Sequence, residues 1–332
     1  MRRILLFLLI VLIPVAPVAA GQSVDSFPIR VVHQYGETTI ATPPERVVSV
    51  GYHEQDFLYA LGIAPVGVHE WFGNYPYATW PWAESARQAL GAAPGVQRGF
   101  EIDIEWVLAQ DPDLIVATFA PLDQRSYAIL SQIAPVVGPP AGYPAWGAPW
   151  QEELRLIGRA TGTATRAETV LAELDSQIKA TARTFPQLSG LRGTAAHFAG
   201  GQIIGYRSAD GANRLLARLG IKTPPGFDDL AGSGGNFGIS LERIDLLDLD
   251  VVLWLVDAPS RQRIEALAPY QALRLSREAR SVWADRELMG AMSFQSPLSI
   301  TWALERLAPA LAAAADGDPA TDALPGLRRN GS

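Results

Sequence analysis

Residues 46–68 read RVVSVGYHEQDFLYALGIAPVGV, and this stretch decides the fold. The β-branched run at 46–51 predicts a buried strand, residues 54–61 predict a helix that stops at Gly62, and residues 64–68 predict a second strand. A strand, a helix and another strand in such close succession form a βαβ unit, in which the two strands lie parallel. We therefore expect an α/β fold.

The same alternation continues on both sides of a long helical segment. A helix at 103–109 leads into a strand at 113–117, and a helix at 127–133 leads into a strand at 135–137. Between Ala167 and Phe185, apolar residues recur every three or four positions, which predicts one long amphipathic helix. The later segments repeat the pattern, with strands expected at 193–198 and 251–255 and helices at 211–219, 241–247 and 300–315.

One phrase occurs in both halves of the chain. IDIEWVL at 102–108 precedes the strand PDLIV, and ISLERID at 239–245 precedes the strand DVVL. Two lobes of common design explain this repetition. We expect two Rossmann-like lobes with central, mainly parallel sheets, joined by one long interdomain helix. The expected boundaries are 21–148 for the first lobe, 149–186 for the connector and 187–332 for the second lobe.

The N-terminus and the composition indicate an exported protein. Residues 1–20 contain two arginines, an apolar run and a small-residue ending, which is the pattern of a secretory signal peptide. A retained membrane anchor is the alternative, but the apolar run is shorter than the ~20 residues that a bilayer span needs. The chain has no cysteine, which excludes disulfides, thiolate metal sites and an acylated cysteine anchor. We therefore expect a free, monomeric periplasmic protein.

The net charge makes nucleic acid an improbable partner. It is −7, and only Lys179 and Lys222 among the 27 basic residues are lysines. Proteins that bind nucleic acid need a clustered basic face to displace phosphate counterions. The sequence contains no such cluster, so no nucleic-acid partner is expected.

Five stretches in order resemble one family of transport proteins. The chain is similar to the iron-siderophore substrate-binding proteins of ABC importers, the bilobal class III type whose lobes are joined by one helix. The resemblance implies capture of a ferric siderophore in the cleft between the lobes and delivery to the permease of an ABC importer. Haem and cobalamin binders share this architecture and remain alternatives. The stretches are SVGYHEQDFLYALGIAPVGV (49–68), IEWVLAQDPDLIVAT (104–118), YAILSQIAPVV (127–137), ISLERIDLLDLDVVLW (239–254) and FQSPLSITWALERLAPAL (294–311).

The resemblance also implies a function for the glutamate of the repeated phrase. In this family one glutamate on each lobe docks into arginine pockets of the permease, and the matching positions are Glu105 and Glu242. A carboxylate and a guanidinium pair bidentately, and two distant pairs fix orientation as well as affinity. The alternative is that each glutamate is a solvated acid favoured by the helix dipole.

Aromatic residues after strands are the candidates for the ligand site. A chelator already fills the coordination sphere of its iron, so the protein needs aromatic walls and arginines and no direct metal ligands. The richest stretch, residues 71–82, follows a strand, and ligands of open α/β sheets bind at the carboxyl ends of strands. We expect no cofactor. The candidate ligand-binding residues are Tyr52, His53, Trp71, Phe72, Phe119, Trp146, Tyr206, Arg207, Trp254 and Phe294.

Bare metal, haem and enzymatic functions have weaker support. The four histidines lie on separate segments without the paired spacing of a zinc site. A haem ligand could come from Tyr52, His53 or Tyr206, so haem stays open. An exported α/β hydrolase is an alternative of another class, but the sequence has no Gly-x-Ser-x-Gly, phosphate-loop or His-Glu-x-x-His motif. We therefore expect a binding protein and not an enzyme.

Overall fold

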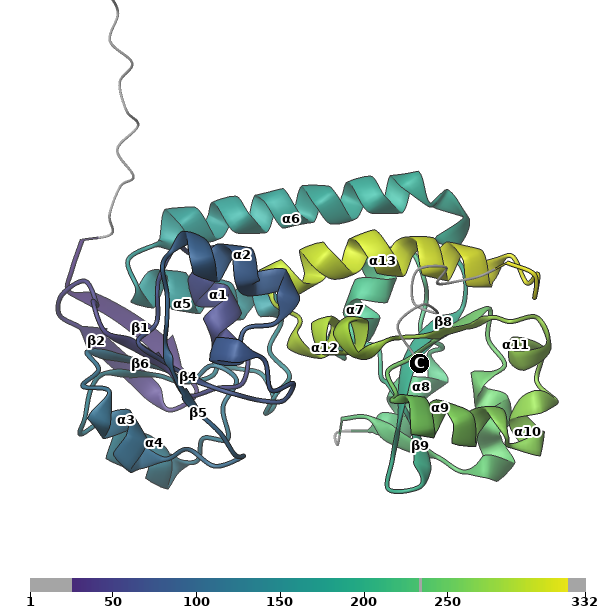
Figure 1. Ribbon diagram of the computed structural model, residues 1–332, viewed down its shortest axis with the longest axis horizontal. Coiled ribbons are helices and arrows are strands. Elements are labelled where there is room, and N and C mark those ends of the chain that lie inside the picture. Colours follow the sequence, from purple (N-terminus) through teal and green to yellow (C-terminus); the bar gives the residue numbers. More distant parts are fainter. Residues whose placement is uncertain (1–25, 233–234, 322–332) are drawn as a thin grey trace, which may run out of the picture.

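Two five-stranded sheets form the centres of two lobes (Figure 1). The structure, a computed structural model, describes residues 26–232 and 235–321, so the expected signal peptide lies outside the described residues. The sheet of the first lobe has the order β5-β4-β3-β6-β7, and all its neighbouring strands are parallel. Its strands are β3 (Val47–Ser49), β4 (Gly67–His69), β5 (Gly95–Gln97), β6 (Leu114–Val116) and β7 (Val136–Val137).

Short helices and a hairpin complete the first lobe. The hairpin consists of β1 (Ile29–His33) and β2 (Gly36–Ile40), whose buried residues Val31 and Ile40 join the core of this lobe. An aspartate carboxylate accepts a backbone N–H at the start of each of two helices, Asp103 at α3 and Asp123 at α4. The helices are α1 (Glu54–Ala60), α2 (Pro81–Ala89), α3 (Ile104–Ala109) and α4 (Gln124–Leu130), with the short 3₁₀ helix η1 (Pro76–Ala78) before α2.

The second lobe has a mixed sheet. Its order is β10-β9-β8-β11-β12, in which β8, β11 and β12 are parallel and β9 and β10 are antiparallel to their neighbours. The strands are β8 (Gly193–Ala199), β9 (Gln202–Gly205), β10 (Phe237–Ile239), β11 (Val251–Trp254) and β12 (Ser281–Trp283). Its helices are α7 (Gly211–Arg218), α8 (Gly226–Ala231), the 3₁₀ helix η3 (Leu241–Leu247), α9 (Ala258–Glu265), α10 (Ala268–Gln271), α11 (Arg274–Arg277), α12 (Arg286–Phe294) and α13 (Pro297–Ala315).

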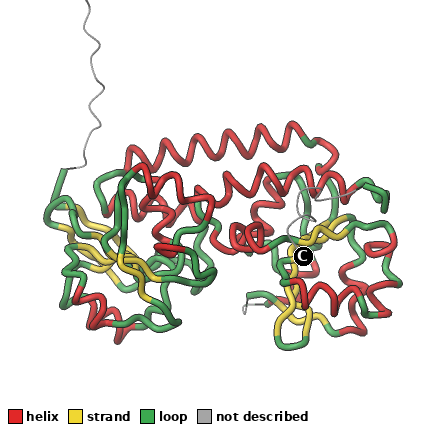
Figure 2. Tube along the Cα trace, in the orientation of Figure 1, coloured by secondary structure: helices red, strands yellow, loops and turns green. Residues whose placement is uncertain are grey.

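One long helix joins the lobes, as predicted, and a second long helix packs across their junction. Helix α5 (Trp150–Ala160) packs against β1, β7 and α1 of the first lobe, and the long helix α6 (Ala164–Thr184) and the 3₁₀ helix η2 (Pro186–Leu188) lead from there to the second lobe. Helix α6 is the predicted amphipathic helix. Helix α13 starts at the junction of the lobes, packs against α1, α2 and α6, and ends at the far side of the second lobe (Figure 1). Figure 2 shows the strands as separate groups, one in each lobe, below this shared layer of helices.

A hydrophobic cluster, which we call the junction core, packs residues of the two lobes against each other. Trp80 and Trp82, at the start of α2 in the first lobe, pack in it with Phe294, Ile300 and other residues of α12 and α13. A Cβ atom on Gly290 would lie 2.7 Å from the Trp80 ring, so only glycine permits this approach. The junction core thus adds side-chain packing between the lobes to the predicted interdomain helix.

A buried carboxylate adds a polar contact to the junction. Asp56 of α1 accepts hydrogen bonds from Trp82 Nε1 and from Ser296 Oγ, each at 2.6 Å. Ser296 also forms a capping box with Ser299 at the start of α13. The first turn of α13 is thus tied to the first lobe. In the described part of the chain, no helix is long and apolar enough to cross a membrane.

Candidate functional site

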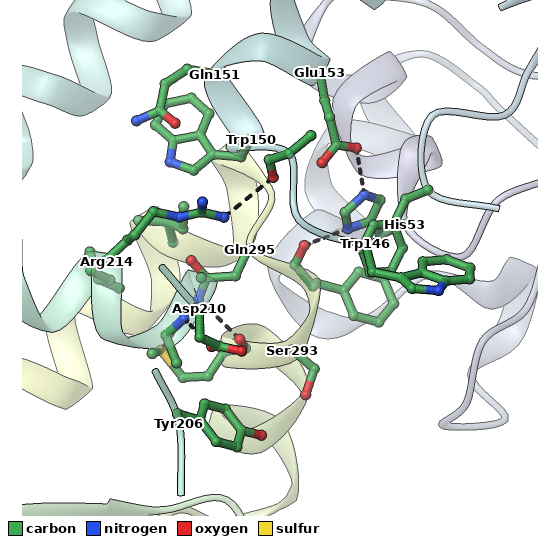
Figure 3. Close-up of a pocket in the computed structure, with 18 of the residues that line it drawn as sticks. His53, Trp146, Trp150, Gln151, Glu153, Tyr206, Asp210, Arg214, Ser293 and Gln295 are labelled. Carbon is green, nitrogen blue, oxygen red and sulfur yellow. Dashed lines mark hydrogen bonds and ion pairs between the residues drawn. The ribbon is translucent and has the colours of Figure 1, made fainter. Parts of the chain in front are cut away.

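A pocket of about 600 Å³ lies between the lobes, and both lobes and the connector contribute to its wall (Figure 3). This volume is within the range typical of small-molecule sites. Seven residues with rings contribute to the lining, namely His53, Trp71, Phe119, Trp146, Trp150, Tyr206 and Phe294.

The first lobe contributes residues that follow its parallel strands. His53 follows β3, Trp71 follows β4, Phe119 follows β6 and Trp146 lies in the loop after β7. Because the carboxyl ends of parallel strands meet at one edge of the sheet, these side chains converge although they are distant in sequence. The position of the pocket is therefore the one that the strand pattern predicts.

Stacked rings form one wall of the pocket. The Tyr52 ring lies between those of Trp71 and Trp146, with both centroid distances 5.7 Å and interplanar angles of 14° and 10°. Phe119 meets the Trp146 ring edge-on at 4.6 Å. Trp146 is 49% exposed and has a φ of 61°, a left-handed conformation that is uncommon for a bulky residue. An exposed indole held in this way presents a flat apolar surface to a ligand.

A buried ion pair lies beneath the rings. His53 Nε2 is 2.9 Å from a Glu153 carboxylate oxygen, and His53 Nδ1 is 2.5 Å from the Phe294 carbonyl oxygen (Figure 3). With Glu153 ionised, both partners accept hydrogen bonds, so both ring nitrogens of His53 donate and the ring carries a positive charge. Burial alone would lower the pKa of His53, but the charge and the hydrogen bond of Glu153 outweigh burial and raise it.

A second carboxyl group beside this pair, that of Glu54, also accepts hydrogen bonds. Glu54 accepts the backbone N–H of Phe119 at 2.8 Å and that of His53 at 3.2 Å. Burial raises the pKa of Glu54, and the nearby His53 charge opposes that effect. Within residues 26–232 and 235–321, no group of three or more histidine and acidic side chains could hold a metal ion.

The second lobe supplies a charged wall that sequence reasoning missed. Arg214 of α7 donates to the carbonyl oxygens of Gly147 and Ala148, each at 3.3 Å, in the loop that carries Trp146. Asp210 caps the same helix by accepting the Ala212 N–H at 2.9 Å. Burial lowers the pKa of Arg214 and raises that of Asp210. Asp210 and Arg214 thus lie at the start and in the middle of one helix, on the same side of the pocket.

Comparison with known proteins identifies the family. The family model described as "Periplasmic binding protein" matches residues 47–269, from β3 of the first lobe into α10 of the second. The chain belongs to the periplasmic binding protein family. The two α/β lobes with mainly parallel sheets predicted from the sequence are confirmed, and so is the resemblance at the level of the family.

Solved structures of similar proteins cover most of this periplasmic binding protein. A periplasmic solute binding protein from Mycobacterium smegmatis str. MC2 155 is 33% identical, with a TM-score of 0.76 over 86% of this chain and 97% of that chain. The Streptococcus pneumoniae TIGR4 protein PiaA, solved in complex with ferrichrome, is 20% identical, with a TM-score of 0.76 over 87% and 99%. At 20% identity, the similarity to PiaA shows the fold alone.

Curated relatives match over shorter stretches. A Bacillus subtilis (strain 168) protein named "Probable siderophore-binding lipoprotein YfiY" is 25% identical over 209 residues, which are 62% of this chain and 61% of the relative. The "Achromobactin-binding periplasmic protein" of Dickeya dadantii (strain 3937) is 36% identical over 94 residues, 28% of this chain and 29% of the relative. The matches thus span about six tenths and three tenths of these relatives.

The structure brings most, but not all, of the predicted ligand-binding residues to the pocket. Tyr52 is buried between Trp71 and Trp146, does not itself line the pocket, and donates its hydroxyl to the Phe100 carbonyl at 2.7 Å. Phe72 packs instead against Trp71 and Trp80 at the edge of the junction core. The six that line the pocket are His53, Trp71, Phe119, Trp146, Tyr206 and Phe294.

The prediction for Trp254 requires correction, whereas Arg207 lies beside the pocket. Successive residues of a strand face opposite sides of the sheet, and Trp254 of β11 faces away from the pocket. Its ring is fully buried and stacks on Trp283 at 5.2 Å. Arg207 is half-buried beside the pocket wall and is not part of it, and its backbone N–H donates to Asn236.

The two predicted docking glutamates occupy equivalent places. Glu105 lies in the first turn of α3, which precedes β6, and Glu242 lies in the first turn of η3, which precedes β11. Strands β6 and β11 are each fourth in the order of their sheets. Both side chains are exposed, and no ion pair within the described residues involves either of them.

Proposed function

We propose that this periplasmic binding protein captures a ferric siderophore in the interlobe pocket and delivers it to an ABC importer. The observation that carries the proposal is the pocket wall, to which several aromatic rings contribute and in which the buried His53 is hydrogen-bonded to Glu153. Such a wall suits a metal that arrives with its coordination sphere filled. The name of the Bacillus subtilis relative, a probable siderophore-binding lipoprotein, supports the same ligand class.

Contacts from both lobes would hold the chelate. The first lobe offers the stacked rings, and the second offers Tyr206 and Arg214. The ligand would favour the closed arrangement of the lobes to the extent that it binds the closed arrangement more tightly than the open one. Because the junction core and two long helices connect the lobes, the accompanying hinge motion should be small. The protein would act as an exported periplasmic monomer without a cofactor.

Haem is the second candidate ligand. The surroundings of its three candidate axial ligands argue against it. Both ring nitrogens of His53 are bonded, and the Tyr52 hydroxyl donates to a carbonyl. Burial raises the pKa of Tyr206, which disfavours the phenolate form that would bind iron. Cobalamin-binding proteins share this fold, and cobalamin needs no axial ligand from the protein. Cobalamin is therefore included in the same binding test.

Titration of the nine tryptophans' fluorescence tests the ligand class. The panel would contain ferric hydroxamate, catecholate and citrate complexes together with haem and cobalamin. We expect stoichiometric quenching by at least one ferric chelate, without turnover, and none by haem or cobalamin. Binding of haem or cobalamin alone would refute the siderophore proposal.

The permease contact rests on Glu105 and Glu242, and a double variant tests it. Glu105→Ala with Glu242→Ala should abolish uptake of radiolabelled ferric siderophore and leave ligand affinity unchanged, because both carboxylates are exposed and neither lines the pocket. Glu45→Ala with Glu305→Ala removes one exposed glutamate from each lobe and is the matched control. Wild-type uptake by the Glu105/Glu242 variant would remove the docking role.

A further inference from the structure

The loop that carries Trp146 has a composition that does not fix its own shape. It spans residues 138–149, between β7 and α5, and reads GPPAGYPAWGAP. Four of these residues are prolines, which have no backbone N–H to donate, and three are glycines, which adopt many conformations. Such a loop needs contacts with other segments to hold one arrangement.

Ring contacts hold the indole of Trp146 on the side of the first lobe. The indole stacks on Tyr52 at 5.7 Å and meets the ring of Phe119 at 4.6 Å. The backbone of Trp146 is left-handed, with a φ of 61°, and Gly147 closes the turn by donating its N–H to the Pro144 carbonyl at 3.0 Å. An uncommon backbone conformation persists only where the surroundings enforce it. We therefore looked for a further contact beside Trp146.

The second lobe supplies this contact through Arg214. Its Nη1 donates to the Gly147 carbonyl and its Nη2 to the Ala148 carbonyl, and these two residues directly follow Trp146. In Figure 3, Arg214 lies on the side of the pocket opposite Trp146. At 3.3 Å each bond is long, but the planar guanidinium presents its donors as a rigid fork. Two bonds from one fork restrict the loop more than a single bond would.

The helix that carries Arg214 is itself firmly placed. The neighbouring Asn213 is fully buried, and its side-chain oxygen accepts the Ala195 N–H of β8 at 2.8 Å. Its amide group donates to the Thr194 hydroxyl and to the Tyr206 carbonyl, at 3.0 and 2.9 Å. These bonds tie α7 to the sheet of the second lobe. The second lobe therefore sets the position of the guanidinium.

We propose that Arg214 is a positioning residue of the ligand site: from the second lobe it holds the loop of the first lobe and thereby places the Trp146 ring. Its effect on ligand affinity rests on the proposed siderophore function, whereas its effect on the loop does not. Because the donor and the acceptors belong to different lobes, both hydrogen bonds break when the lobes separate. The Trp146 wall is then complete only while the lobes are in contact.

Quenching of tryptophan fluorescence by acrylamide, an uncharged quencher, tests the positioning without a ligand. The difference between the wild type and Trp146→Phe gives the contribution of Trp146. The same difference is then measured in the Arg214→Ala background. The quenching constant of this contribution should rise about 2-fold, because a ring that is 49% exposed becomes free in solvent. An unchanged constant overturns the inference.

A double-mutant cycle with ferrichrome as the probe tests the effect on affinity. By calorimetry, Arg214→Ala should weaken binding about 10-fold in the wild type but no more than about 3-fold in the Trp146→Ala background. A positioning residue loses its effect when the group that it positions is absent, and the remaining loss measures direct contact between Arg214 and the chelate. Equal losses in both backgrounds, or no loss in either, would overturn the inference.

Arg46→Ala is the matched control. Arg46 also donates to two successive carbonyl oxygens, those of Gln110 and Asp111, but it lies before β3, at the end of the sheet opposite the pocket. Its loss should change neither the quenching of Trp146 nor the affinity for ferrichrome. Alanine is the best helix former, so α7 should remain intact in Arg214→Ala, which circular dichroism would verify.

The two tests separate the inference from the function on which its affinity effect rests. Increased quenching in Arg214→Ala without ferrichrome binding to the wild type would support the positioning and count against ferrichrome as a ligand. Tight ferrichrome binding with unchanged quenching would overturn the positioning and leave the siderophore function standing.

Discussion

Tryptophans occur at two places between the lobes and serve different purposes there. In the junction core, Trp80 and Trp82 are 1% and 6% exposed and stack on each other at 4.8 Å. In the pocket, Trp146 is 49% exposed although it stacks on Tyr52. The surface that the opposite lobe presents makes the difference. At the junction it presents Gly290, which admits the Trp80 ring, whereas at the pocket it recedes and leaves a cavity of about 600 Å³.

This comparison teaches that the junction stabilises the arrangement of the lobes and that the pocket leaves rings available for binding. Further contacts tie the segment before α2 to α12, including the Arg286 guanidinium 5.1 Å from the Tyr75 ring centroid. Substitutions at the junction should therefore change stability, and substitutions at the pocket should change affinity.

The largest expected effect is at the junction. Trp80→Ala removes a fully buried indole that packs against Gly290 and Phe294, and such truncations cost roughly 3–5 kcal/mol of unfolding free energy. Urea denaturation followed by circular dichroism would measure the loss. A loss below about 1 kcal/mol would show that the junction core does not fasten the lobes as the packing implies.

The next effect concerns the pH dependence of the junction. Burial raises the pKa of Asp56 from its ordinary 3.8 to about 6, against the opposing hydrogen bonds from Ser296 and Trp82. Between these two values the folded state retains a proton that the unfolded state has lost. Stability therefore falls as the pH rises from about 4 to about 6, by roughly 3 kcal/mol from this one group.

Asp56→Asn removes this penalty because the amide does not ionise. Relative to the wild type, the variant should gain roughly 3 kcal/mol of unfolding free energy between pH 4 and pH 7, whatever constant offset the amide introduces. Denaturant titrations of both proteins at the two pH values would measure the gain. An equal difference at both values would refute the raised pKa.

The same two regions show what the sequence could reveal. The lobes, the long helix and six pocket residues were predictable, because periodic apolar patterns and strand ends are local signals. The second-lobe strand 237–239 was missed because it pairs with a segment far away in the chain. Strand 202–205 was also missed, although Gly200-Gly201 between it and strand 193–199 is a hairpin signal. Trp254 was misplaced because the strand VVLW is buried on both faces, so its pattern does not say which face lies toward the pocket.

Of the pocket residues that were not predicted from the sequence, one could have been recognised from its local pattern. Glu153 is a carboxylate on the apolar face of α5, beside the buried Leu156 and Ile157, and a charge in that position indicates a buried partner. Arg214 had none, because its approach to the loop carbonyls depends on how the lobes meet. A charge on a helix of ordinary amphipathic pattern is most often solvated.

The smallest effect on stability should accompany a clear loss of binding. Trp146→Ala removes a half-exposed indole, so the unfolding free energy should change by less than about 1 kcal/mol. The loss of one stacking wall should weaken binding of the ferric chelate about 10-fold, measured by calorimetry because the variant also loses a fluorophore. Trp146→Phe keeps a ring against Tyr52 and should recover most of the affinity. If alanine and phenylalanine instead weaken binding equally, the Trp146 ring is not a ligand wall, and the contrast between the two groups of tryptophans fails at the pocket.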